Sequence, residues 1–148
     1  LKRTVKGTNC LILGYGRIGK FLARLLLNLH ASVTVAARKG KDLVQAELDG
    51  CIPCPLRDLA GCLPRCDVLY NTIPHIILDQ TLLPLVPKSC LCIDLASKPG
   101  GIDLRAAEQL ELETIWALGL PGKVAPGSAG QAIVDTVLQI LTEQEVSL

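Results

Sequence analysis

Short apolar runs alternate with amphipathic stretches along the whole chain. The apolar runs are rich in branched aliphatic side chains and have the length of buried strands. The stretches between them place apolar residues three or four positions apart, the spacing of helices packed on a sheet. This pattern predicts strands at 9–13, 33–38, 51–52, 67–74, 91–95 and 114–118. It predicts helices at 17–31, 41–48, 56–63, 79–85, 103–110 and 128–141.

The first predicted strand runs directly into a glycine-rich turn. Gly14, Gly16 and Gly19 form a G-x-G-x-x-G pattern where a strand gives way to a helix. The first glycine permits the tight turn, the second lets a diphosphate approach the backbone, and the third allows close packing of helix on strand. The alternative is a tight turn that binds no nucleotide. The loop residues predicted to bind a dinucleotide are Gly14, Tyr15, Gly16, Arg17, Ile18 and Gly19.

Strand, glycine turn, helix and second strand together make a βαβ unit. Further strands alternate with helices after it, which predicts an α/β fold: a doubly wound parallel sheet of the Rossmann type. We expect the Rossmann domain to span 9–148 and residues 1–8 to end a linker from a missing N-terminal domain. The chain contains no methionine, so we expect a piece of a longer chain or a processed product.

The end of the second strand bears on which dinucleotide fits. NAD-binding domains of this type carry an acid about 20 residues after the glycine loop, where it hydrogen-bonds the adenosine ribose. Here the residues are Ala37, Arg38 and Lys39, and the next acid is Asp42. A guanidinium and an ammonium suit a 2′-phosphate. We therefore expect NADP, with Arg38 as the main discriminator and NAD as the second choice, unless both cations are merely solvated.

Two further loops follow predicted strands and border the same rim, where doubly wound sheets hold their ligands. The loop after strand 67–74 is expected along the nicotinamide ribose, with a capped turn as the alternative. The loop after strand 91–95 contains glycines that let backbone approach a ligand. Asp94 either orients a catalytic group or caps the next turn. The binding residues predicted here are Asn71, Thr72, Ile73, Pro74, Leu95, Ala96 and Ser97.

The amino-acid composition argues against two classes of binding partner, nucleic acids and membranes. Of 148 residues, 49% are hydrophobic, and 15 Lys and Arg against 14 Asp and Glu leave a net charge of +1. This balance gives no basic field for nucleic acid. Charges and prolines interrupt every apolar run before it reaches membrane-spanning length, so we expect neither nucleic acid nor membrane as a partner and a cytoplasmic location.

Seven cysteines raise the alternatives of a disulfide framework and a metal site. Their odd number argues against a disulfide framework, and reduced thiols are expected. Cysteines 51, 54, 62 and 66 only loosely imitate zinc-ligand spacing, so no metal is predicted. Cys10, Cys90 and Cys92 lie in strand-like runs and are expected to be small core residues.

The loops described above resemble those of the bacterial dipicolinate synthase family, in the C-terminal nucleotide-binding domain of its A-type polypeptide. One departure is His30-Ala31, where Gly-Ala is commoner before the second strand; we expect it to affect the turn and not the chemistry. The resemblance spans nearly the whole chain. The segments that carry it are 14–19, 35–38, 71–74, 93–97, 99–101, 120–126 and 128–130.

This resemblance implies an oxidoreductase subunit that oxidises dihydrodipicolinate, or its hydrated precursor, to dipicolinate in sporulation, with NADP or NAD as hydride acceptor. It also implies two partners, a dicarboxylate substrate and a flavoprotein-like B subunit. Catalytic residues are not assigned, His75 included, and homo-oligomer formation is left open. Rim residues that suit a dicarboxylate are Ser97, Lys98, Lys123 and Ser128.

Two other functions are compatible with the glycine loop. One alternative is a nucleotide-sensing or regulatory module, which binds a dinucleotide without catalysis. The chain is also compatible with a degenerate domain that binds neither NADPH nor NADH and only holds the B subunit.

Overall fold

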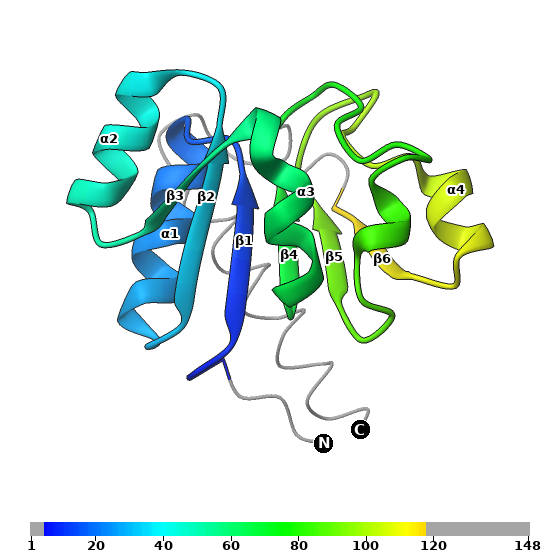
Figure 1. Ribbon diagram of the computed structural model, residues 1–148, viewed down its shortest axis with the longest axis horizontal. Coiled ribbons are helices and arrows are strands. Elements are labelled where there is room, and N and C mark those ends of the chain that lie inside the picture. Colours follow the sequence, from blue (N-terminus) through cyan, green and yellow to red (C-terminus); the bar gives the residue numbers. More distant parts are fainter. Residues whose placement is uncertain (1–4, 118–148) are drawn as a thin grey trace.

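The computed structural model describes residues 5–117, which form a parallel sheet with helices on both faces (Figure 1). The strands are β1 (Asn9–Leu13), β2 (Ser32–Ala37), β3 (Ile52–Pro55), β4 (Val68–Asn71), β5 (Leu91–Asp94) and β6 (Glu113–Trp116). Within this part of the chain the sheet has six strands in the order β3-β2-β1-β4-β5-β6, and each neighbouring pair is parallel. The direction of winding reverses between β1 and β4, so the doubly wound sheet is confirmed.

The helices connect successive strands. They are α1 (Arg17–Asn28), α2 (Gly40–Leu48), α3 (Leu59–Cys62) and α4 (Leu104–Gln109). Three short 3-10 turns accompany them, namely η1 (Leu56–Asp58), η2 (Leu63–Arg65) and η3 (Leu83–Leu85). The predicted helix at 128–141, together with Lys123 and Ser128, lies outside the described residues.

Alternate side chains of the strands enter two separate cores. Ile12 of β1 packs in the core under α1, together with Leu22 of that helix. Leu11 and Leu13 point to the opposite face and share a core with Leu59 of α3. All five side chains are buried, and burying one such side chain contributes roughly 1.5–3 kcal/mol to stability. This period of two fixes which face of the sheet each side chain enters.

His30 lies in the turn between α1 and β2, and its expected lack of effect on the chemistry stays a prediction. Its φ is 63°, the left-handed conformation that glycine adopts most easily. The backbone N–H of His30 donates to Leu27 O, and that of Ala31 donates to Leu26 O, which closes the last turn of α1. The histidine that replaces the commoner glycine therefore affects the conformation of this turn.

The predicted helix at 79–85 is wrong. The side chain of Asp79 accepts hydrogen bonds from the N–H groups of Thr81 and Leu82, which is the pattern of a helix N-cap. Pro84 has no N–H to continue the helical bonds, and only the short turn η3 forms. The segment still packs inward, because Leu83 is fully buried.

The segment 52–65 also differs from expectation. β3 extends to Pro55 although it contains two prolines, because it is the edge strand and needs partners on one side only. The helix predicted at 56–63 is divided into η1, α3 and η2. Among the described residues, no helix is long and apolar enough to cross a membrane.

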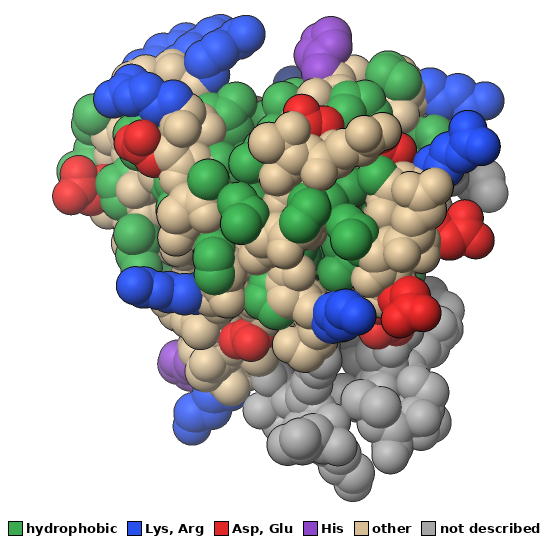
Figure 2. All heavy atoms as spheres, turned by 45° about the vertical axis from the view of Figure 1, so that its right-hand side comes forward, with side chains coloured by type: hydrophobic (Ala, Val, Ile, Leu, Met, Phe, Trp, Pro, Cys, Tyr) green, Lys and Arg blue, Asp and Glu red, His purple; other side chains and the backbone are tan. Residues whose placement is uncertain are grey.

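The surface has an uneven distribution of charge. On the face turned forward in Figure 2, uncharged surface fills most of the middle, and the Lys and Arg side chains lie mainly around the outline. Six large apolar side chains are exposed among the described residues, and these are Phe21, Val44, Leu48, Ile52, Ile76 and Leu85.

Candidate dinucleotide-binding site

The glycine loop joins β1 to the N-terminus of α1. Gly14 has a φ of 93°, and a Cβ there would lie 2.5 Å from Thr72 Oγ1. A Cβ on Gly19 would collide with the carbonyl oxygen of Gly14, so α1 packs directly on the loop. A Cβ on Gly16 would meet nothing within 4 Å. The loop is thus tightly packed at its ends and open in its middle, where a diphosphate would reach the free amides of α1.

Tyr15 fastens the loop to α2. Its ring is buried, and its hydroxyl donates a 2.5 Å hydrogen bond to a carboxylate oxygen of Asp49, which follows α2. Burial and this bond raise the pKa of Tyr15 above its ordinary value. The same bond, with a second from Gln45, lowers the pKa of Asp49. The hydroxyl therefore stays protonated and the carboxylate stays charged near neutral pH.

Two hollows lie along the rim and meet at Gly14 and Ile73. Each has a volume of about 290 Å³. The first extends over the end of β2 and is lined by Gly14, Tyr15, Ala37, Arg38, Lys39, Asp42, Leu56, Ile73, His75 and Ile77. The second lies beside the start of α1 and is lined by Gly14, Gly16, Arg17, Ile18, Thr72, Ile73 and Pro74. Eleven of the sixteen predicted binding residues line one hollow or both.

Arg38 and Lys39 follow directly after β2 and are exposed. Within residues 5–117 neither forms an ion pair, so both cations are available to an anion in the first hollow. Asp42, in the first turn of α2, lines the same hollow and is half-buried. The hollow therefore places two cations and one acid around the position where an adenosine ribose would lie.

A buried carboxylate organises the other two loops of the rim. Asp94 and Asn71 end neighbouring strands in register, and both side chains are buried. Oδ1 of Asp94 accepts hydrogen bonds from Asn71 Nδ2 (2.9 Å) and the N–H of Ala96 (3.1 Å). Oδ2 accepts from the N–H groups of Gly101 (2.8 Å) and Ile102 (3.2 Å). Of the two roles weighed for Asp94, the structure shows the capping one.

Most of the remaining predicted residues support the rim loops through buried contacts and hydrogen bonds. The Asn71 amide bonds the backbone of Ile73 and the carboxylate of Asp94, and so holds both loops. Leu95 and Ala96 are buried, and the carbonyl of Ala96 accepts a hydrogen bond from Trp116 Nε1. Ser97, by contrast, is exposed, as is Lys98. Their contact with a ligand stays a prediction.

Sequence reasoning missed part of the first hollow. Leu56 and Ile77 were not singled out as binding residues, because Leu56 begins a predicted helix and Ile77 stands in an ordinary apolar run, 76–78. His75 has no role assigned from the sequence, and it lines the hollow while being exposed. The sequence signal that could have placed His75 at the hollow is its position directly after the rim loop that ends at Pro74.

The cysteines that imitate zinc spacing are not gathered at one point. Cys54 and Cys62 adjoin each other, whereas Cys66 lies against Cys90 with 3.6 Å between the sulfurs. In the described part of the chain, no three His, Cys, Asp or Glu side chains are grouped to hold a metal ion. Cys10, Cys90 and Cys92 are buried, so their prediction as core residues is confirmed.

Comparison with known proteins shows which family with this fold the chain resembles. No protein-family model matches the chain. It is 38% identical over 140 residues to the A subunit of dipicolinate synthase from Bacillus subtilis, a match that covers 95% of the chain and 47% of that protein. The crystal structure of the Bacillus halodurans A subunit superposes with a TM-score of 0.80 at 38% identity, over 95% of this chain and 49% of that one. The resemblance to the dipicolinate synthase A subunits is confirmed.

The chain thus spans about half the length of the dipicolinate synthase A subunits it matches. The fold itself is shared more widely. The D-lactate dehydrogenase of Escherichia coli superposes with a TM-score of 0.66 at 15% identity, over 78% of this chain and 38% of that one. At that identity the likeness to D-lactate dehydrogenase shows the fold alone.

Proposed function

We propose that the rim binds NADP, and that the chain is the cofactor half of an oxidoreductase subunit of the dipicolinate synthase type. The observation that carries this is the pair of hollows meeting at Gly14, with open space over Gly16 and the cations Arg38 and Lys39 at the far end. This arrangement suits a diphosphate at the start of α1 and a 2′-phosphate at the end of β2.

The residues of the chain have distinct parts in this proposal. When bound, a nicotinamide dinucleotide supplies a hydride acceptor. The amides at the start of α1 hold its diphosphate, and Arg38 holds the adenosine phosphate through charge-assisted hydrogen bonds. The loop anchored by Asp94 presents the exposed Ser97 and Lys98 toward a dicarboxylate substrate. Dihydrodipicolinate is the substrate we infer, because the matched relatives are named dipicolinate synthase.

Three further parts of the proposal concern the whole protein. Because the chain covers about half of its relatives, we expect an N-terminal domain that completes the substrate site. The relatives are named as A subunits, which supports a partnership with a B subunit. We place the assembly in the cytoplasm of a sporulating cell, where fractionation would locate it.

Titration with NADPH and NADH tests the binding half of this proposal. Replacing Arg38 by Asp removes a charge-assisted pair, so we expect NADPH to bind roughly 5- to 150-fold more weakly, equivalent to about 1–3 kcal/mol. NADH should be much less affected, since it lacks the 2′-phosphate. Isothermal titration calorimetry measures both affinities.

The matched control is Lys41→Asp, which makes the same charge change on α2 at a residue outside the hollow. It should leave the preference between the two dinucleotides unchanged. Equal losses for NADPH and NADH in Arg38→Asp would reject the NADP assignment, and Asp42→Asn would then test Asp42 as the ribose ligand of NAD. Failure of the unaltered protein to bind either dinucleotide would favour the degenerate domain.

A nucleotide-sensing module is the second candidate. The half-buried Asp42 in the first hollow fits an NAD-binding sensor as well as an NAD-dependent enzyme, because an acid near the adenosine ribose is typical of NAD-binding domains. The sensor and the enzyme share dinucleotide binding and differ in turnover.

A further inference from the structure

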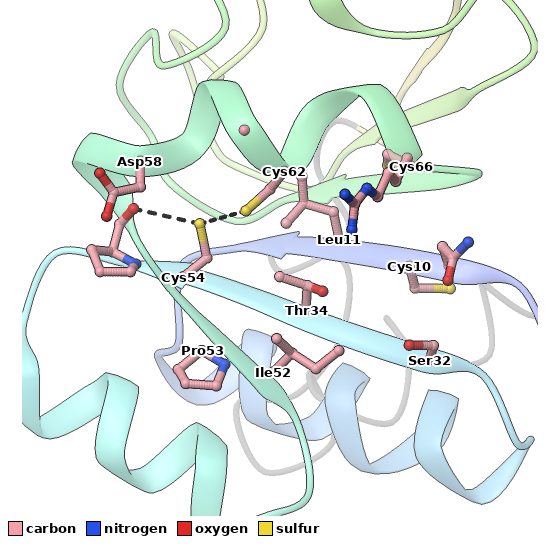
Figure 3. A pocket seen from close by; sticks show the side chains of 14 residues that line it. Cys10, Leu11, Ser32, Thr34, Ile52, Pro53, Cys54, Asp58, Cys62 and Cys66 are labelled. Atoms are coloured by element: carbon pink, nitrogen blue, oxygen red, sulfur yellow. Dashed lines mark hydrogen bonds between the residues drawn. The ribbon is translucent and has the colours of Figure 1, made fainter.

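A third hollow lies over the sheet beside α3 and shares no residue with the two rim hollows (Figure 3). Its volume is about 410 Å³, and its walls come from β1, β2, β3 and the segment around α3. Cys54 of β3 and Cys62 at the end of α3 both line it. Their side chains point toward one another, and the two sulfurs are 2.6 Å apart. Neither is in a disulfide.

The two thiols differ in access. Cys62 is half-buried, whereas Cys54 is only 4% exposed. Burial, and next the contact with Cys62, raise the pKa of Cys54 to about 12. A thiol held protonated reacts poorly with an outside molecule. A reagent in the hollow therefore meets Cys62 first, with Cys54 placed behind it.

We propose that Cys54 and Cys62 are a modification site, which forms a reversible disulfide by exchange with a low-molecular-weight disulfide of the oxidised glutathione kind. The Cys62 thiolate attacks one sulfur of the small disulfide, which forms a mixed disulfide and releases one small thiol. Cys54 loses its proton to solvent and attacks the Cys62 sulfur, and the second small thiol leaves. In balance, two protein thiols are oxidised and one small disulfide is reduced to two thiols.

The surroundings favour this pair over the other cysteines. Cys66 and Cys90 are 3.6 Å apart, but both are buried, and although Cys66 lines the hollow, this pair has no half-buried thiol like Cys62 for a small disulfide to meet first. Arg65 lines the same hollow as Cys62, and its guanidinium suits a carboxylate of glutathione. The acid Asp58 also lines the hollow, and its carboxylate suits the ammonium of the same molecule.

The bond would join the edge strand to the segment that crosses to the other half of the sheet. Within residues 5–117, that segment is held by η1, α3 and η2, which are each one short turn. Closing the loop from Cys54 to Cys62 restricts the unfolded chain more than the folded one. Oxidation is therefore expected to move the midpoint of urea unfolding upward.

Mass spectrometry of the whole folded protein tests the proposal. The protein is equilibrated in buffers of increasing oxidised to reduced glutathione, quenched with acid and N-ethylmaleimide, and digested with trypsin. We expect peptides 42–57 and 58–65 to become linked, with a mass about 2 Da below their sum. Dithiothreitol should separate them. Peptides 66–88 and 89–105, which carry Cys66 and Cys90, should stay unlinked.

Variants identify the pair, because peptide 42–57 also contains Cys51. The link should vanish in Cys54→Ser and in Cys62→Ser, and it should persist in Cys51→Ser. The upward shift of the urea midpoint should disappear in Cys54→Ser. Absence of the linked peptide at the most oxidising ratio, or its survival in Cys54→Ser, would overturn the proposal. Both results are independent of whether the rim binds a dinucleotide.

Discussion

Asp94 is a charged residue in an almost fully buried position, and four hydrogen bonds compensate its burial. Three of the donors are backbone N–H groups of residues 96, 101 and 102. The fourth is Asn71, which ends the neighbouring strand. Two glycines allow this close approach, since a Cβ on Gly101 would collide with the Asn71 side chain, and one on Gly100 would lie 2.8 Å from the carboxylate. The rim loops therefore depend on one side chain.

Replacing Asp94 by Asn should destabilise the protein by roughly 2–4 kcal/mol. The NH₂ group of asparagine cannot accept hydrogen bonds, so one or two buried N–H donors lose their partner, at about 1–3 kcal/mol each. Urea unfolding at neutral pH measures the change. Asp67→Asn is the matched control, because Asp67 accepts an exposed bond from the N–H of Asn9. A loss at Asp94 no larger than at Asp67 would contradict the role assigned to this carboxylate.

The bond between Tyr15 and Asp49 couples two elements, the glycine loop and α2. It explains how a loop with an open middle keeps its shape. α1 begins without a side-chain cap, so the loop is positioned by its packing on Thr72 and by the anchored Tyr15 ring. Arg38 and Lys39 lie between the end of β2 and the start of α2, and line the same hollow as Tyr15.

Tyr15→Phe should lower the free energy of unfolding at neutral pH by about 0.5–1.5 kcal/mol, the usual range for one hydrogen bond. The bond lowers the pKa of Asp49 below its ordinary 3.8 in the folded state. Its contribution is therefore present above the unfolded pKa of Asp49 and lost as pH falls through the lower folded value. The difference between variant and wild type should shrink below about pH 4.

The other tyrosine provides the control for this experiment. Tyr70 is fully buried, and among the described residues its hydroxyl has no hydrogen-bond partner. Tyr70→Phe removes a hydroxyl and no bond, so it should be neutral or slightly stabilising at both pH values. A Tyr15→Phe variant that behaves like Tyr70→Phe would show that the bond to Asp49 contributes nothing.

Prediction from the sequence succeeded where the signal was local. The glycine loop, the strands around it and the cations after β2 are read from neighbouring residues, and the structure places them on one rim. The prediction of a helix at 79–85 was wrong because Pro84 lacks the N–H that an α-helix needs there, and only η3 forms. Leu56 and Ile77 could not be predicted, since only folding brings their distant loops to one hollow.

In the proposed function, the described residues supply one wall of an active site, and the rest of the protein supplies the other. The chain covers about half of its relatives, and the exposed Ser97 and Lys98 reach out from the rim. Enzymes of two domains bind ligands in the crevice between them. The proposed function therefore expects turnover of the whole protein together with a B subunit, and not of residues 5–117 alone.

A coupled assay tests this expectation. The whole protein and its B subunit, supplied with dihydrodipicolinate and NADP, should form dipicolinate and reduced dinucleotide in equal amounts. Arg38→Asp should raise the KM for NADP with little change in kcat, because Arg38 binds a part of the dinucleotide remote from the reacting ring. Lys41→Asp serves as the control for charge. Dinucleotide binding without any turnover in this mixture would favour the sensor.

The prolines of β3 have a consequence for how copies of this protein can assemble. Pro53 and Pro55 alternate with Ile52 and Cys54 along the edge strand. Successive residues of a strand direct their amides to opposite sides, and proline has no N–H to donate. The amides available to β2 are thus those of Ile52 and Cys54, and the outward side of β3 offers an added strand no donor. An oligomer built by extending the sheet past β3 is disfavoured on that ground, since only carbonyl acceptors face outward.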